Sequence, residues 1–133
     1  MKNCAALLVA AMAITSLNNA ARAENWPTRP VHVIVPITGG SAIDIVARAV
    51  SQRLEKKFGQ PFVVENRPGA GTTLGAAVVA RAPADGYTIL FDSAALTTTP
   101  TTVANLSYNV DKNFAAVAPV VETLVRVGGR EDR

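Results

Sequence analysis

Apolar positions along this chain follow two periodicities, and each change of period marks a new element. A nearly continuous β-branched run, Val31 to Val35, is typical of a strand that is covered on both faces. Between residues 43 and 58 the apolar positions recur every three or four residues, which predicts an amphipathic helix that Gly59 ends. The same reasoning predicts a strand over residues 61–65, a helix that Thr72 or Thr73 caps and that runs to about Ala82, and a strand over residues 87–91.

Strands that alternate with helices at these lengths imply right-handed parallel crossovers. The sequence therefore predicts an α/β fold in three layers, with helices on both faces of a parallel sheet. The pattern is weaker after Asp92, where we expect a short helix within residues 93–102, a connection at 106–109 and one or two further strands within 117–127. Residues 128–133 are polar and have no packing pattern, so we expect a frayed tail.

The first 23 residues have the three-part pattern of a secretory leader. Lys2 precedes an apolar run at residues 5–14, and Ala21-Arg22-Ala23 offers a small-x-small cleavage site. The apolar run is shorter than the about 20 residues that cross a bilayer, which favours a cleaved signal peptide over a membrane anchor. We therefore expect the chain from Glu24 onward to be a soluble protein of an extracytoplasmic compartment.

Composition excludes several classes of function. Removing Lys2 and Arg22 with the leader leaves 11 of the 13 basic residues against 10 acidic ones. The basic residues are scattered, so nothing favours nucleic acid or an anionic membrane as a partner. The single cysteine, Cys4, lies in the leader, and a structural position is favoured over a catalytic one for the only histidine, His32. We therefore expect no enzyme activity, no metal and no cofactor.

The glycine-rich stretch after the second predicted strand favours a structural role. Gly69-x-Gly71-x-x-x-Gly75 has one residue too many for a dinucleotide fingerprint, and it follows Asn66-Arg67-Pro68 rather than the strand itself. Tight turns and close passage of the backbone are the expected use of these glycines. A small exported hydrolase or transferase that uses this loop remains an alternative, although no catalytic base accompanies it.

The best candidate binding site is the loop from Pro36 to Asp44, between the first strand and the first helix. Its backbone N–H groups and the helix N-terminus point out of the strand ends, an arrangement that favours a carboxylate or phosphate. The alternative is structural, because Ser41 and Asp44 have the spacing of a capping box. The segment that begins at Ser93-Ala94 could supply donors beside this loop, or serve only as a polar loop or cap. The candidate ligand-binding residues are Thr38, Gly39, Gly40, Ser41, Asp44, Ser93 and Ala94.

Several strings of residues occur together in the order found in one family. The most specific are Glu65 to Gly71, which reads ENRPGAG, and Asp85 to Leu90, which reads DGYTIL. The other strings are residues 26–30, 34–36, 44–48, 59–61 and 79–82, and Tyr108 with residues 111–114. On these residues the chain resembles the Bug-type (TctC-like) extracytoplasmic solute receptors of tripartite tricarboxylate transporters, from residue 26 to about 120.

The resemblance implies a fold, a ligand and partners. It implies the parallel-sheet three-layer lobe of a type II periplasmic-binding-protein fold, in a periplasmic protein that binds a small carboxylate between two lobes. Such a receptor delivers its ligand to the membrane permease subunits of the transporter, and it has no nucleic-acid partner. By resemblance, the Pro36 to Asp44 loop is the first lobe's contact with the ligand carboxylate. Three positions depart from the family, with Ile37 in place of a phenylalanine, Ser41 in place of a glycine and Ile43 in place of a threonine.

The resemblance also predicts how the chain is divided. Members of the family are more than twice as long, so we expect residues 24–120 to be the N-terminal part of the first lobe. They would follow a signal peptide at residues 1–23 and precede a divergent tail at residues 121–133. The second lobe would then be largely absent, because of a truncation or a frameshift. An incomplete lobe exposes apolar surface, so a non-binding interaction module is a further alternative.

Overall fold

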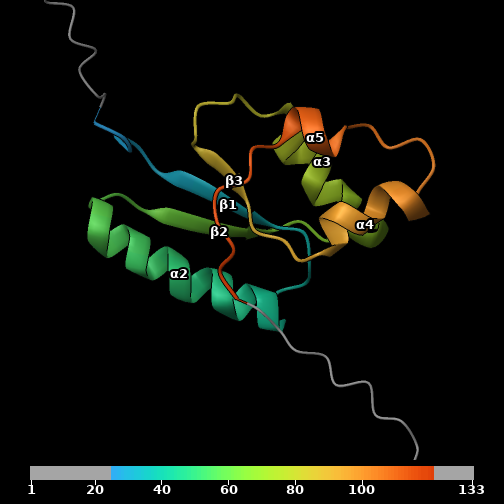
Figure 1. Ribbon diagram of the computed structural model, residues 1–133. Helices are drawn as coiled ribbons and strands as arrows, with labels where there is room; N and C mark the ends of the chain where they lie inside the picture. Colours follow the sequence, from blue (N-terminus) through green and yellow to red (C-terminus); the bar gives the residue numbers. More distant parts are fainter. Residues whose placement is uncertain (1–24, 122–133) are drawn as a thin grey trace, which may run out of the picture.

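The computed structural model describes residues 25–121, which are built around a three-stranded parallel sheet (Figure 1). The strands are β1 (Val31–Val35), β2 (Phe62–Asn66) and β3 (Thr88–Leu90). Both β2 and β3 pair with β1 in parallel, and the order across the sheet is β2-β1-β3. The predicted α/β class with a parallel sheet is therefore confirmed.

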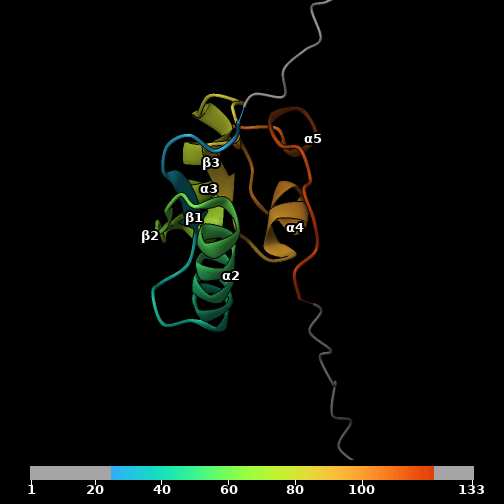
Figure 2. The same ribbon diagram turned by 90° about the vertical axis from the view of Figure 1, so that its left-hand side faces the viewer.

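Helices cover both faces of this sheet, which makes the three layers that the sequence predicts. The helical elements are α2 (Ala42–Phe58), the single turn η2 (Ala70–Thr72), α3 (Thr73–Arg81), α4 (Ala95–Thr102) and α5 (Val110–Asn113). Helix α2 lies along one side of the sheet, and α3, α4 and α5 gather on the other (Figure 1; Figure 2).

The alternation of side chains along β1 divides the core into two clusters. Val31 and Val33 point to the α2 side, where they pack with Phe62 of β2 and Leu54 of α2. On the opposite side, Leu90 packs against a second cluster. The buried members of that cluster are Ala76, Ala77 and Tyr108. Burial on both faces is the reason why the residues of β1 form a nearly continuous apolar run.

Local sequence signals define α2 at both ends. Ser41 is the N-cap, and its Oγ accepts a hydrogen bond from the backbone N–H of Asp44 at 3.2 Å. Gly59 ends the helix in the left-handed conformation, at a φ of 71°, and its N–H donates to the carbonyl of Glu55 at 2.8 Å. The predicted helix and its glycine cap are both confirmed.

The start of α3 corrects the predicted cap. Thr72 occupies the N-cap position with a φ of 80° and makes no side-chain hydrogen bond to the helix, so its predicted capping role is wrong. The chain has to turn sharply between β2 and α3, and it does so through consecutive left-handed residues, among them Gly69 at 139° and Gly71 at 62°. These positive φ angles confirm the predicted tight turn at Gly69 and Gly71.

The later elements agree with the predictions only in part. The short helix within residues 93–102 is confirmed as α4, and the connection at 106–109 is confirmed. Strand β3 is shorter than predicted, and residues 117–121 form no strand. Those residues find no neighbouring strand here, and Val117 is 88% exposed. The predicted signal peptide and the tail from residue 122 lie outside the described residues.

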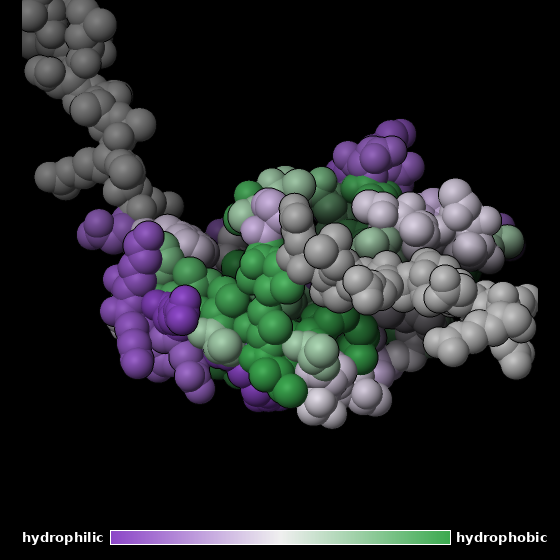
Figure 3. Space-filling model, turned by 60° about the horizontal axis from the view of Figure 1, so that its bottom comes forward, coloured by the Kyte–Doolittle hydropathy of each residue, from purple (hydrophilic) through white to green (hydrophobic). Residues whose placement is uncertain are grey.

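Apolar side chains reach the surface at several places. The most exposed of them in the described part of the chain include Ile45, Leu74, Val117 and Val121. A continuous apolar band crosses one side of the molecule, as Figure 3 shows. A surface of this kind is typical of a region that makes further contacts. None of the helices in residues 25–121 has the length and apolarity needed to cross a membrane.

Candidate functional site

The carboxyl ends of the three strands lie at one edge of the sheet. Val35 of β1 lies opposite Asn66 of β2, and Ile34 lies opposite Leu90 of β3. The loops that follow the strands therefore emerge side by side (Figure 1). This edge is where open parallel sheets place their ligands.

The loop after β1 presents backbone donors at this edge. Thr38, Gly39 and Gly40 are exposed, and the loop leads directly into the N-terminus of α2. Within the described residues, the N–H groups of Thr38, Gly39, Ala42 and Ile43 have no hydrogen-bond acceptor. Free N–H groups beside the positive end of a helix dipole form a site for an anion.

Asp44 lies behind this loop and holds it in place. Asp44 is only 3% exposed. Its Oδ2 accepts hydrogen bonds from Gly40 N at 2.8 Å and Arg48 Nε at 3.0 Å, and its Oδ1 accepts one from Asn66 Nδ2 at 2.9 Å. The hydrogen bond from Arg48, followed by those from Gly40 and Asn66, lowers the pKa of Asp44 to about 2. The predicted capping box is therefore half formed, because the carboxylate bonds to Gly40 rather than to the N-cap residue.

Asn66 connects this network to the end of β2. Its Nδ2 also donates to the carbonyl of Ile37 at 3.1 Å, and its Oδ1 accepts from Arg48 Nη2 at 3.0 Å. Asn66 thus bonds both to Ile37, at the start of the loop after β1, and to the side chains of Asp44 and Arg48 on α2. Sequence reasoning missed Asn66 and Arg48, although Arg48 stands four residues after Asp44 on the same helix, a spacing typical of ion pairs.

The segment after β3 lies at the same edge of the sheet as the loop after β1. The N–H of Phe91 donates to the carbonyl of Ile34 at 2.9 Å, so the next residue, Asp92, lies beside Pro36. Asp92 Oδ1 accepts from Ser93 N at 2.7 Å, and Ser93 Oγ accepts from the N–H of Ala95 at 3.2 Å. The hydroxyl of Ser93 is therefore partly used to cap the first turn of α4.

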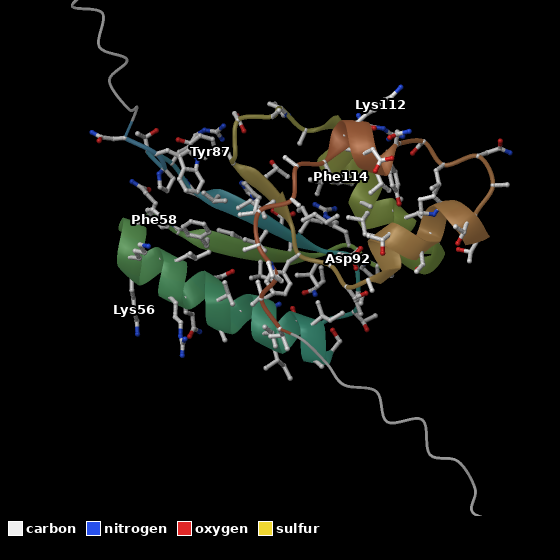
Figure 4. All side chains as sticks on the ribbon, viewed as in Figure 1. Lys56, Phe58, Tyr87, Asp92, Lys112 and Phe114 are labelled. Carbon is white, nitrogen blue, oxygen red and sulfur yellow. The ribbon has the colours of Figure 1, made fainter. Side chains whose placement is uncertain are left out.

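Asp92 is another residue that sequence reasoning missed. Its Oδ2 is buried and has no hydrogen-bond partner within residues 25–121. Burial raises the pKa of Asp92 above its ordinary value. Figure 4 places its side chain between the strand ends and α4. No motif in the sequence marks this residue, although the predicted sheet already places the adjacent Ser93 and Ala94 beside the loop after β1.

The predicted site residues thus fall into two groups at one edge of the sheet. Thr38, Gly39, Gly40, Ser41 and Asp44 belong to the loop after β1, and Ser93 and Ala94 follow β3. The backbone N–H of Gly40 and both oxygens of Asp44 are already bonded within the protein. Direct contact of any of these residues with a ligand remains a prediction.

Reactive groups are few in the described part of the chain. No cluster of three His, Cys, Asp or Glu residues that could hold a metal ion occurs there. His32 lies on β1, where its Nδ1 is 2.6 Å from Glu65 Oε1. The hydrogen bonds from His32 and Arg67 lower the pKa of Glu65. This arrangement fits the structural role that the sequence favours for His32.

Two shallow depressions lie away from the loop. Their volumes are about 240 and 320 Å³, and the lining residues come from α3, α4, α5 and the connections around Tyr108. Residues 36–44 and 92–94 line neither of them. Within residues 25–121 the candidate anion site is therefore an open rim of backbone donors rather than a closed cavity.

Known proteins are similar to this chain in sequence over most of the described residues. The profile of the tripartite tricarboxylate transporter family receptor, TctC, matches residues 46–128. A UPF0065 protein of Bordetella bronchiseptica is 42% identical over 116 residues, which are 86% of this chain and 35% of the relative. Protein BugT of Bordetella pertussis is 44% identical over 71 residues, which are 53% of this chain and 22% of that protein. The chain spans about a third or less of the length of these relatives.

Two solved structures are similar to the chain in fold and sequence. MatC from Rhodopseudomonas palustris, with bound malate, is 38% identical with a TM-score of 0.57. The match covers 67% of this chain and 31% of MatC. A TctC solute binding protein from Polaromonas, without ligand, is 32% identical with a TM-score of 0.55. That match covers 58% of this chain and 27% of the Polaromonas protein.

Proposed function

The chain belongs to the tripartite tricarboxylate transporter receptor family, and on that premise we propose that it supplies first-lobe contacts in an extracytoplasmic solute-binding protein for a small carboxylate. The profile match covers more than half of the chain, and the fold is the parallel α/β lobe that the family resemblance implies. The ligand, the partners and the location that follow are parts of this proposal.

The free backbone donors after β1 carry the proposal. A carboxylate at the rim would receive hydrogen bonds from the N–H groups of Thr38, Gly39, Ala42 and Ile43, beside the N-terminus of α2. Asp44 does not oppose the ligand's charge, because Arg48 pairs with it behind the loop at 3.0 Å. Neutral donors held by a rigid network suit reversible binding rather than chemistry, so we infer a binder and not an enzyme.

The ligand class is supported by a relative. MatC is a solved structure with bound malate, and it is 38% identical to this chain over the matched part. We infer a dicarboxylate or a related small carboxylate as the ligand. We also infer delivery to the membrane permease subunits of a tripartite transporter, in the periplasm, because the family profile is that of its receptor.

Calorimetric titration of the purified chain with malate, succinate and a tricarboxylate tests the proposal. We expect saturable heat with at least one of them. In the variant Thr38→Asp, a like charge at the exposed rim should weaken binding about tenfold. Ser107→Asp is the matched control, since Ser107 is an exposed loop residue outside the rim. Absence of heat with every ligand would contradict carboxylate binding by this chain.

A second candidate function is an interaction module, and the exposed apolar surface favours it. Val117, Val120 and Val121 are 88%, 49% and 61% exposed, and an apolar band crosses one side of the molecule (Figure 3). Sedimentation velocity separates the two functions. Concentration-dependent association without carboxylate binding would favour the interaction module, and a monomer that binds a carboxylate would favour the receptor.

A further inference from the structure

Asp92 differs from the other buried or half-buried carboxylates of the described chain in having no cation. Asp44 pairs with Arg48 at 3.0 Å, and Glu65 pairs with Arg67 at 3.0 Å. Asp92 forms no ion pair within residues 25–121, and its Oδ2 is both buried and without a hydrogen-bond partner. Its negative charge is therefore uncompensated by any described side chain.

Asp92 follows β3 at the same edge of the sheet as the loop after β1, which forms the proposed ligand rim. The backbone bond from Phe91 N to Ile34 O, at 2.9 Å, places Asp92 next to Pro36, where the loop after β1 begins. Asp92 also directly precedes Ser93 and Ala94, the two candidate residues after β3. The labelled side chain of Asp92 lies centrally in Figure 4, at the strand ends that face α4.

The groups that face Asp92 do not neutralise it. Ser93 donates its backbone N–H to Oδ1 at 2.7 Å, but burial raises the pKa of Asp92 by more than the backbone and hydroxyl of Ser93 lower it. The hydroxyl of Tyr108 comes from the connection before α5, and it is buried without a partner of its own in the described residues. Burial and the charge of Asp92 raise the pKa of Tyr108, so the phenol stays neutral at ordinary pH. A negative charge in such surroundings acts more strongly on its neighbours than it would in water.

We propose that Asp92 is a specificity-determining residue that selects carboxylate ligands carrying an ammonium or another hydrogen-bond-donating group over plain dianions. The inference rests on the proposed function, since it concerns the same rim. The N–H groups after β1 attract one carboxylate of the ligand, and the Asp92 carboxylate repels a second negative charge placed at the β3 side. An ammonium group at that position is attracted instead.

Three ligands with one four-carbon skeleton test this selection. Succinate carries no substituent, malate carries a hydroxyl and aspartate carries an ammonium group. Calorimetry at pH 7.5 on the wild-type chain, on Asp92→Asn and on the control Asp111→Asn gives the affinity ratio of aspartate to succinate. Asp111 is an exposed carboxylate on α5, so its replacement removes the same charge away from the rim.

We expect wild type and Asp111→Asn to share one ratio in favour of aspartate. In Asp92→Asn this ratio should fall about three- to tenfold, the size expected for one charge acting over a few ångströms in a partly solvated site. An Asp92→Asn ratio within twofold of wild type, with binding retained, overturns the selection but leaves the proposed function standing. Binding of none of the three ligands by any of the chains overturns the proposed function, and the selection with it. Asp92→Ser, with folding checked by urea denaturation, replaces Asp92→Asn if that variant does not fold.

Discussion

At the scale of single residues, the closest backbone approach at the site occurs where α3 passes the end of β1. A Cβ atom added at Gly75 would lie 2.7 Å from Pro36 Cβ and 2.9 Å from the carbonyl oxygen of Arg67. Both obstacles belong to rigid parts of the chain, one a proline ring and the other the backbone. Only glycine therefore lets α3 pack this closely against Pro36, where the loop after β1 begins.

We predict that Gly75→Ala destabilises the fold by about 1–3 kcal/mol, because the new methyl group overpacks a rigid contact. Urea denaturation measures the change. Gly39→Ala is the matched control, since its Cβ would meet Asn66 Oδ1 at an ordinary 3.4 Å. A change at Gly75 no larger than at Gly39 would contradict the close packing.

The network around Asp44 predicts a loss of stability in acid. The folded pKa of Asp44 is lowered to about 2, first by Arg48 and then by Gly40 and Asn66, whereas the unfolded chain has the ordinary value of 3.8. Because the pKa is depressed on folding, the stabilisation is fully present above pH 4 and is lost as pH falls toward 2. Denaturation midpoints measured from pH 6 to pH 2 should fall less for Asp44→Asn than for wild type. Parallel curves for the two proteins would refute the assignment.

The contribution of Asp92 to stability should depend on pH in the opposite sense to that of Asp44. Burial raises its pKa, so the folded chain binds this proton more tightly than the unfolded chain does. The charged carboxylate then costs stability above its folded pKa, and the cost disappears as pH falls to the ordinary range of an aspartate. We predict that Asp92→Asn raises the melting temperature at pH 7 and that the gain shrinks toward pH 4. A variant that melts below wild type at pH 7 would show that the charge is compensated.

At the scale of elements, α2 shows which features can be predicted from sequence. Its apolar spacing, the N-cap Ser41 and the C-terminal Gly59 are all local, and the helix forms within one residue of the predicted start. The N-terminus of α3 shows the opposite case. Thr72 is a good capping residue by type, yet the turn from β2 forces it to a φ of 80°, so its hydroxyl does not reach the helix donors. No local pattern reports such a turn.

The cap of α2 is itself testable. We predict that Ser41→Ala costs about 1 kcal/mol, because the N–H of Asp44 loses its side-chain acceptor. Ser107→Ala, at an exposed position without a hydrogen bond of this kind, should change stability by less than about 0.5 kcal/mol. Equal effects in urea denaturation would contradict a role of Ser41 at the helix start.

At the scale of the whole molecule, strand order brings together what the sequence separates. The loop after β1 could be predicted as a candidate site because a strand, a glycine turn and a helix follow one another locally. Asn66 and Asp92 could not, since Asn66 reaches Asp44 across 22 residues and no sequence pattern shows that Asp92 Oδ2 is buried without a partner. The strings ENRPGAG and DGYTIL nevertheless identified the family, which the profile match over residues 46–128 confirms.

The central claim is that backbone donors after β1 bind a carboxylate. Nuclear magnetic resonance titration of the ¹⁵N-labelled chain with malate tests it most directly, because it reports each amide separately. We predict saturable shifts concentrated at the free N–H groups of Thr38, Gly39, Ala42 and Ile43. Saturable shifts centred instead on the depressions beside α3, α4 and α5, or no saturable shift at these four amides, would contradict it.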